Sequence, residues 1–400
     1  MKKPELIMPA GSMEKLRYAI AYGADAVYLG TSEYSLRSAA AFDWDSLSEA
    51  ILYAKKKKTK SYLTLNAYPH PAGLRSLEKD LGKIRELEPD ALVVADPGVL
   101  ETVLPLGIPI HLSTQANTLN ARSARFWVKN GVSRIILARE LSLNEISEIH
   151  QEAPEVELEA FVHGAMCMAY SGRCLLSNFL AERDANQGAC AQTCRWNYRL
   201  IEEKRPGESF PVEEDGHGSY ILSSRDLCMI EHLPLLTKAG VRYFKVEGRA
   251  KSAYYAAGVA KAYRAAIDRL GDDSYQVEDL LEELILLPHR GFSTGFFFGA
   301  PGPGDHAYLE ASAHRPREFA GRILSWENGL ATVEVRNTIV LGNSIELLDP
   351  EKNVRFEVAE IRDEEGKSLP RAHPGQKISL PTPEATEWSL LRTEGCPCDC

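Results

Sequence analysis

The fold is decided by a repeating unit, and its first copy is residues 5–29, ELIMPAGSMEKLRYAIAYGADAVYL. The unit opens with a short apolar run, passes through turn residues into a segment with apolar residues at three- and four-residue spacing, and reaches a second apolar run. Gly23 follows the helical segment, at the position where a left-handed helix cap favours glycine. The pattern predicts a strand, a helix packed against it, and the next strand.

The same unit continues along the chain, and Gly107 and Gly131 again stand where a helix should end. Seven strands are predicted before residue 163, and an eighth follows a long interruption. The predicted strands are Glu5 to Met8, Ala24 to Leu29, Ser61 to Leu65, Ala91 to Val94, Ile108 to Leu112, Arg134 to Leu137, Val156 to Val162 and Arg242 to Val246. The predicted helices are Met13 to Tyr22, Leu47 to Ala54, Leu77 to Leu87, Ala121 to Lys129, Lys251 to Leu270 and Val277 to Leu286.

Eight β-α units in series favour an α/β fold with a closed, TIM-barrel-like (β/α)8 domain. An open doubly wound sheet stays the alternative, because strand order cannot be read from one sequence. We expect the barrel domain in residues 1–300, with an insertion at 163–241 that holds a hairpin of Tyr198 to Glu202 with Ser219 to Leu222. A linker at 301–316, a small antiparallel β-barrel-like domain at 317–383 with Asn-Gly and Gly-Asn turns, and a cysteine-containing tail at 384–400 follow.

The composition excludes several classes of protein. With 44% hydrophobic residues and a net charge of −10, the chain resembles an ordinary globular protein rather than a disordered or fibrous one. No apolar run approaches the roughly 18 residues of a membrane helix, and residues 1–5 do not begin a signal peptide, so we expect a cytoplasmic protein without a membrane partner. Residues 161–260 carry a net charge of +1, whereas the rest of the chain carries −11. This segment is therefore less acidic than the rest of the chain, which permits RNA binding.

Five of the eight cysteines fall within the predicted insertion: Cys167, Cys174, Cys190, Cys194 and Cys228. Disulfides are disfavoured in a reducing compartment, and the polar neighbours of these residues disfavour plain buried thiols. Only Cys190 and Cys194 have the tight spacing of a structural zinc site, so the wide spacing of the others favours an iron-sulfur cluster. Four ligands suffice for a four-iron cluster, and the spacing does not show which cysteine is surplus. The role of Cys396, Cys398 and Cys400 is not indicated.

Polar residues follow most of the predicted strands. If the barrel is right, these residues meet at one mouth, since the carboxyl ends of all eight strands lie there. The less specific reading of each residue is a helix cap or a loop residue. Arginines among and near them would suit a substrate with carboxylates or phosphates, because a guanidinium pairs with two oxygens at once. The strand-end residues are Asn66, Asp96, Ser113, Thr114, Gln115, Arg139, Glu140, His163, Glu247 and Arg249, and Arg173 lies nearby in the insertion.

Hydrolytic motifs give little support to a hydrolase. The chain has no His-Glu-x-x-His zinc motif and no P-loop. Ser171 and His163 could form a nucleophile and its base, but they flank the cysteines of a ligand loop. A serine hydrolase is therefore disfavoured.

Several strings together resemble the collagenase-like peptidase family U-32, and within it the branch of tRNA 5-hydroxyuridine modification proteins. The likeness spans about residues 4 to 383. The strings are Leu112 to Asn117, Leu137 to Ser142, His163 to Cys174, Arg183 to Asn186, Cys190 to Trp196 and Lys245 to Arg249.

The resemblance implies oxygen-independent hydroxylation of a tRNA wobble uridine, with a 4Fe-4S cluster and with prephenate as a co-substrate. Carried over by motif, the ligands are Cys167, Cys174, Cys190 and Cys228, with Cys194 as the alternate. Arg37 also fits the family's pattern, whereas Ala41 stands where the family often has Asn. A ribosomal RNA cytidine or a quinone precursor is the alternative substrate.

We therefore expect a cluster at the barrel mouth and a tRNA anticodon loop docked above it, with Tyr170 or Trp196 stacked on the target base. A small dicarboxylate would be bound beside it, and a protein partner of the same family would be compatible with this arrangement. Two other readings stay open: a collagenase-like peptidase, and a non-catalytic iron-sulfur accessory protein. The expected catalytic residues are His163, Glu247 and Arg249, and the expected substrate-binding residues are Arg37, Asn66, Gln115, Arg139 and Arg173.

Overall fold

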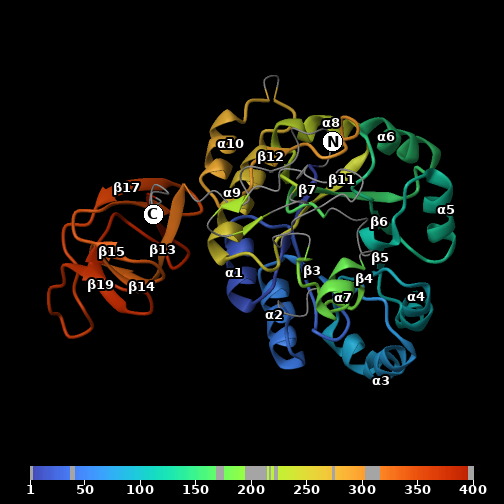
Figure 1. Cartoon of the computed structure of the whole chain (residues 1–400), viewed down its shortest axis with the longest axis horizontal. Coiled ribbons are helices and arrows are strands. Elements are labelled where there is room, and N and C mark those ends of the chain that lie inside the picture. Colours follow the sequence, from blue (N-terminus) through green and yellow to red (C-terminus); the bar gives the residue numbers. More distant parts are fainter. Residues whose placement is uncertain are drawn as a thin grey trace, which may run out of the picture.

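A computed structural model describes the chain over residues 3–36, 41–167, 175–193, 214–215, 218–219, 224–272, 275–301 and 316–394. Figure 1 shows two bodies side by side: a large α/β barrel, and a smaller β domain that the chain reaches last. The predicted linker at 301–316 lies almost entirely outside the described residues.

Eight parallel strands close into a barrel, as the sequence predicts. Each strand pairs with the next in chain order, and β11 pairs with both β1 and β7, so that no edge is left open. In the register of β1, Ile7 lies between Ala26 of β2 and Lys245 of β11. The barrel strands are β1 Glu5–Pro9, β2 Ala26–Leu29, β3 Lys60–Leu65, β4 Ala91–Val94, β5 Ile110–Leu112, β6 Arg134–Ile136, β7 Glu157–Gly164 and β11 Val241–Val246.

Helices cover the outside of the barrel and bury apolar faces against its strands. Many begin at a side chain that accepts a hydrogen bond from a backbone N–H of the first turn, such as Ser12, Asp43, Asn120 and Ser252. The helices are α1 Met13–Ala21, α2 Trp44–Lys56, α3 Pro71–Leu87, α4 Pro97–Val103, α5 Ala121–Lys129, α6 Leu143–Glu152, α7 Leu176–Ala181, α8 Leu233–Lys238, α9 Ala253–Asp268 and α10 Glu278–Ile285. None of those in the described residues is long and apolar enough to cross a bilayer.

All eight predicted strands are confirmed, and Gly23, Gly107 and Gly131 adopt the left-handed conformation predicted for them. Four helices of the described residues were not predicted: α4, α6, α7 and α8. The helix α4 is short, and α6 starts at a capping box in which Ser142 and Glu145 bond each other's backbone N–H groups. That Ser-x-x-Glu spacing is legible in the sequence and would have revealed α6.

The chain between β7 and β11 is not one uniform insertion. The strand β10 (Asp226–Cys228) pairs antiparallel with the end of β7, and β12 (Phe292–Ser293) adds outside it. The helix α8 then occupies the place of the barrel's seventh helix, so the extra segment ends before it rather than at residue 241. A short hairpin joins β8 (Glu214–Asp215) to β9 (Gly218–Ser219), whereas the predicted strand Tyr198 to Glu202 lies outside the described residues.

The small domain is an antiparallel β structure, as predicted, but the predicted end at residue 383 is wrong. The strand β20 lies between β13 and β16 in the middle of the sheet, so the supposed tail supplies a central strand. The Pro-rich residues 381–383 suggested an end but form only a connection. The strands are β13 Arg317–Glu327, β14 Leu330–Val335, β15 Ile339–Val340, β16 Ser344–Leu348, β17 Asn353–Glu357, β18 Arg371–Ala372, β19 Lys377–Pro381 and β20 Leu390–Glu394.

Buried polar contacts join the two domains. Arg392 of β20 has no exposed surface, and its guanidinium lies 2.6 and 2.9 Å from the carboxylate oxygens of Glu283 in α10. Glu346 of the neighbouring strand pairs with the same guanidinium at 3.2 Å. The hydroxyl of Tyr22 lies 2.8 Å from the carbonyl oxygens of both Leu348 and Trp388. The domain interface is therefore specified by groups that lose their partners if the domains separate.

We expect Arg392→Met to lower the free energy of unfolding by about 3–5 kcal/mol, because it removes the buried cation that lies between the carboxylates of Glu283 and Glu346. Urea titration followed by circular dichroism measures the loss. Arg355→Met is the matched control: Arg355 also faces Glu346, but its side chain is 65% exposed, and such pairs contribute at most about 1 kcal/mol. Equal losses of unfolding free energy in the two variants would show that Arg392 does not stabilise the domain interface in this way.

Candidate active site at the barrel mouth

Four of the predicted site residues line one pocket at the carboxyl ends of the strands: Asn66, Gln115, Glu247 and Arg249. The cavity measures about 50 Å³, which is space for a group as large as a carboxylate but not for a whole ring. Its walls are completed by Tyr28, Leu36, Thr64, Val93, Ser113, Thr114, Ile136, Phe161 and Lys245.

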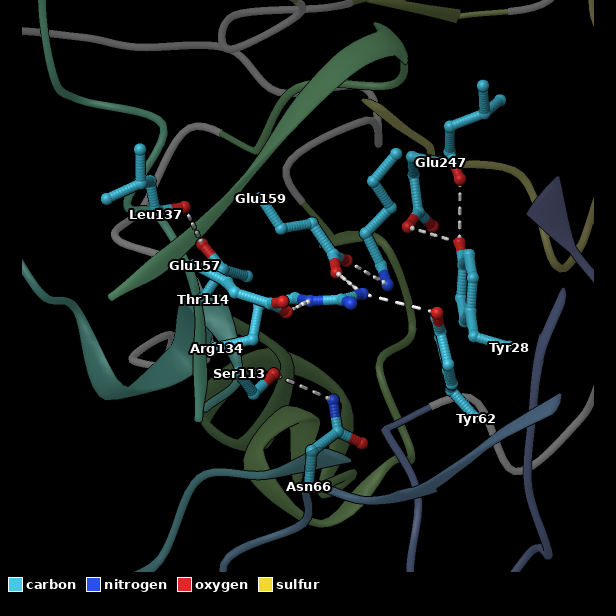
Figure 2. Close-up of polar contacts among 12 residues, drawn as sticks. Tyr28, Tyr62, Asn66, Ser113, Thr114, Arg134, Leu137, Glu157, Glu159 and Glu247 are labelled. Atoms are coloured by element: carbon cyan, nitrogen blue, oxygen red, sulfur yellow. Dashed lines mark hydrogen bonds and ion pairs between the residues drawn. The ribbon is translucent and has the colours of Figure 1, made fainter. Parts of the chain in front are cut away.

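Hydrogen bonds fix the amide groups of this pocket. The Asn66 side-chain nitrogen donates to Gln115 Oε1 at 3.1 Å and to Ser113 Oγ at 3.3 Å, and its oxygen accepts from the backbone of Leu36. Ser113 also contacts the Gln115 side chain directly. Figure 2 shows Asn66 reaching up from β3 to Ser113 beyond the end of β5. The pocket therefore presents oriented amides to whatever enters it.

Arg249 lies almost fully buried at one wall. Its guanidinium donates to Ser35 Oγ at 3.1 Å and to Thr64 Oγ1 at 3.2 Å. Glu247, two residues earlier, is half-buried, and its carboxylate lies 3.4 Å from the hydroxyl of Tyr28 (Figure 2). A cation and a carboxylate thus face the same small space from the segment that follows β11.

Charged residues that the sequence reasoning missed form the floor beneath this pocket. Glu159 of β7 is fully buried, with Lys245 Nζ at 2.8 Å and the guanidinium of Arg134 at 3.4 Å (Figure 2). Tyr62 accepts from Arg134 at 3.3 Å, and Lys245 lies 4.0 Å from the ring centre of Tyr28. Burial lowers the pKa of Lys245, and the carboxylate of Glu159 opposes that effect. Side chains alternate between the inside and the outside along a barrel strand, but only the closed barrel shows which alternate set points inward.

His163 is placed apart from the pocket. Its ring is packed among Tyr255, Tyr263 and Phe292, and Tyr263 OH lies 3.4 Å from Nδ1. Burial lowers the pKa of His163 to about 3, so the ring is neutral and a weak base near pH 7. Of the two expected catalytic residues His163 and Glu247, only Glu247 lines the pocket.

Two other strand-end predictions, Asp96 and Arg139, have local roles. Asp96 caps α4 by accepting from the backbone N–H of Val99 at 3.0 Å. Arg139 donates to the carbonyl of Ala165 at 3.0 Å, so it fixes the start of the cysteine-bearing segment. Arg37, Arg173, Tyr170 and Trp196 lie outside the described residues.

The described cysteines lie around the same mouth. Cys228 ends β10 and pairs in register with His163, and Cys167 follows three residues after the end of β7. Ser224 donates to the carbonyl of Met166 at 2.9 Å, which joins these two stretches. Burial raises the pKa of the Cys228 thiol to about 11, and its Sγ lies 3.8 Å from Tyr263 OH. Cys167 is exposed.

Cys190 approaches from the other side of the mouth. It is half-buried, and its sulfur accepts from the backbone of Gln192 at 3.4 Å. Gly188 packs so closely on the loop after β2 that an added Cβ would lie 2.5 Å from the carbonyl oxygen of Ser35. Cys174 and Cys194 lie outside the described residues, and within the described part no three His, Cys, Asp or Glu side chains are grouped to hold a metal. Thiols that reach one mouth from separate segments fit a soft metal or a cluster by their donor chemistry.

One string, Gly291 to Gly295, has the form Gly-x-Ser-x-Gly that occurs in many hydrolases. A nucleophile elbow needs a strand followed by a helix, with the serine at the sharp turn between them. Here Ser293 lies within β12, its Oγ accepts from the backbone of Gly295 at 3.3 Å, and turns follow instead of a helix. The string is not a nucleophile elbow.

Comparison with known proteins decides the family. The profile of "Peptidase family U32" matches residues 11–307, and that of "Peptidase family U32 C-terminal domain" matches residues 315–392. The chain belongs to peptidase family U32.

Relatives in this family carry names that refer to RNA. The chain is 40% identical to "tRNA hydroxylation protein P" of Escherichia coli, over 98% of this chain and 97% of the relative. It is 38% identical to "tRNA hydroxylation protein P1" of Bacillus subtilis, over 95% and 92%. It is 36% identical to "23S rRNA 5-hydroxycytidine C2501 synthase" of Escherichia coli, over 74% of this chain and 45% of that protein.

The floor of the site predicts a pH dependence of stability. Burial, reinforced by the positive charges of Arg134, Lys245 and Lys60, holds the pKa of His111 well below its usual value of 6.5. Below pH 6.5, His111 therefore binds a proton in the unfolded chain but not in the folded chain. The free energy of unfolding then falls as pH falls, by at most about 1.4 kcal/mol per pH unit for this residue. We expect His111→Gln to remove that part of the slope in urea titrations between pH 7 and pH 5. Parallel curves for the variant and the wild type would show that His111 does not act in this way.

Proposed function

We propose that this chain is an RNA-modifying enzyme that hydroxylates the wobble uridine of tRNA without molecular oxygen. The observation that carries the proposal is the match along nearly the whole chain to proteins named for tRNA hydroxylation. The pocket supports it, because oriented amides, a cation and a carboxylate converge there, at the end of the barrel from which β7 leads to Cys167.

The reaction must be balanced without oxygen gas. In the proposed exchange, RNA–H and a hydroxyl-bearing co-substrate R–OH give RNA–OH and R–H. The pyrimidine C5–H bond is replaced by a C5–O bond, and the C–O bond of the co-substrate by a C–H bond. The RNA carbon loses two electrons and the co-substrate carbon gains them. Prephenate, a dicarboxylate with a ring hydroxyl, is the co-substrate that we propose.

We further propose that Cys167, Cys174, Cys190 and Cys228 hold a 4Fe-4S cluster, with Cys194 as the alternate ligand. When bound, the cluster supplies electron transfer and Lewis acidity. Of the described ligands, Cys228 is held by the β10 to β7 pairing, whereas Cys167 and Cys190 belong to the segments before β10. The high pKa of the buried Cys228 thiol means that binding must displace its proton.

The chain's own residues bind and orient the substrates. The small pocket accepts one carboxylate of the co-substrate beside Arg249 and above Lys245, with Asn66 and Gln115 as hydrogen-bond partners. Arg37, Arg139 and Arg173 are the proposed partners for the remaining charge. Glu247 accepts the proton that leaves the pyrimidine. Because the cavity is too small for a ring, the target base lies unstacked above it rather than within it.

Iron and sulfide analysis after anaerobic purification tests the cluster. We expect about four iron and four sulfide ions per chain in the wild type. Cys228→Ser and Cys190→Ser are expected to lose most of that iron, whereas the matched control Cys400→Ser retains it. A folded wild-type chain without iron would overturn the cluster proposal.

Mass spectrometry of tRNA tests the substrate. Expressed in an Escherichia coli strain that lacks tRNA hydroxylation protein P, the chain is expected to restore 5-hydroxyuridine at the wobble position. Glu247→Gln is expected to reduce the restored fraction at least tenfold, while Glu364→Gln, which changes an exposed carboxylate of the small domain, leaves it unchanged. Restored hydroxycytidine in ribosomal RNA with unmodified tRNA would instead identify the ribosomal substrate. Bound iron with neither product would favour the accessory protein, and gelatin cleavage that a single substitution abolishes would favour the peptidase.

A further inference from the structure

A second pocket lies outside the barrel, next to the mouth. It is formed by the loop after β2, the end of β3, the first turn of α3, Val99 of α4 and Gln187, and it encloses about 210 Å³. Clefts for drug-sized ligands measure roughly 300–1,000 Å³, so this one has the size for a single planar ring system. We call it the rim pocket. Its lining residues are Glu33, Tyr34, Leu65, Ala67, Tyr68, Pro69, His70, Ala72, Gly73, Leu77, Val99 and Gln187.

The rim pocket and the pocket at the barrel mouth described above, here called the mouth pocket, share the end of one strand, β3. Side chains of a strand alternate between its two faces, so Asn66 points into the mouth pocket while Leu65 and Ala67 line the rim pocket. Tyr68 joins them: it lines the rim pocket, and its hydroxyl donates to the carbonyl of Gln115 at 2.6 Å. The two pockets are therefore near enough for neighbouring nucleotides of one polymer to reach both.

The aromatic walls are rigid. Tyr34 is buried, and its hydroxyl donates to Asp80 Oδ2 at 2.7 Å. The backbone of Tyr68 donates to Asn186 at 3.2 Å, so this ring is fixed by its backbone as well as by its hydroxyl. Rings that are fixed before binding make stacking with a flat ligand less costly in conformational entropy. Pro69 and the aliphatic side chains complete a largely apolar interior.

The polar groups of the rim pocket are at its edge. Glu33, His70 and Gln187 are all exposed side chains that line it. An ionised carboxylate only accepts hydrogen bonds, and an amide both donates and accepts. An apolar slot with such an edge matches a nucleobase whose Watson–Crick edge carries an amino group, which uracil lacks.

We propose that the rim pocket binds an unstacked, amino-bearing base of the RNA, next to the nucleotide that is modified. This inference rests on the proposed function, since it names the second base that the same site recognises. Tyr34 and Tyr68 are its aromatic walls, and Glu33 and Gln187 read its edge.

Binding of a fluorescently labelled anticodon stem-loop RNA, measured by anisotropy, tests the proposal with the full-length protein. Ala72→Trp, at the exposed first turn of α3, places an indole in the rim pocket and is expected to weaken binding about tenfold. Gly82→Trp is the matched control on the same helix: an added Cβ there meets nothing within 4 Å, and binding is expected to stay unchanged.

A set of stem-loop RNAs, each with one abasic nucleotide, shows whether the rim pocket recognises one particular base or whether Ala72→Trp lowers RNA affinity non-specifically. One loop position is expected to weaken wild-type binding about tenfold when abasic, and to have no further effect on Ala72→Trp. At that position Glu33→Gln is expected to lose most of the preference for an amino-bearing base over uracil. The rim-pocket proposal is overturned if the abasic loss and the Ala72→Trp loss in affinity multiply at every loop position. It is also overturned if Ala72→Trp and the wild type bind with equal affinity.

The outcomes for the rim pocket and for the proposed function are distinct. If wild type and Ala72→Trp bind the stem-loop equally and both restore hydroxyuridine in cells, only the rim pocket is wrong. If the wild-type chain neither binds the stem-loop nor restores hydroxyuridine, both proposals are wrong.

Discussion

The barrel depends on one buried carboxylate. Glu159 of β7 faces Lys245 of β11 across the seam where the barrel closes, and Arg134 of β6 approaches it from the other side. A charge with no access to water is tolerated only when it is paired and hydrogen-bonded. The three residues therefore constrain one another: losing the anion would leave two cations in the barrel interior. The mouth pocket lies directly above this floor, with Lys245 as a shared residue.

The same seam positions the candidate site. After β11, the chain turns over the mouth and brings Glu247 and Arg249 into the pocket. Beyond its pairing with β11, the end of β7 also pairs with β10, which places Cys228 beside His163. The strand β7 thus supplies Glu159 of the floor and Phe161 of the pocket wall, and it holds Cys228 through its pairing with β10. The separate location of His163, in an aromatic cage, assigns it to packing in this region rather than to the pocket.

The fold was largely predictable because its signal is periodic, whereas the site was only partly so. Eight apolar runs with helices between them suffice to predict the barrel, and the rule for its carboxyl ends correctly grouped Asn66, Gln115, Glu247 and Arg249. The rule failed for Asp96, because a helix cap and a site residue occupy the same place after a strand. It also missed Lys245 and Glu159, since a charge within a strand normally indicates a solvent-facing position. Whether a charge points inward depends on barrel closure, which no local pattern contains.

The position of β20 has a consequence for how the chain matures during synthesis. Residues 390–394 form a strand in the middle of the small domain, between β13 and β16, which are made long before it. While the ribosome is still making residue 380, that sheet has a gap where its central strand belongs, and Arg392 is not yet available to Glu283. The barrel strands and helices, by contrast, are all complete by residue 285. The barrel can therefore fold as a unit during translation, whereas the small domain and its attachment form together, in the last step.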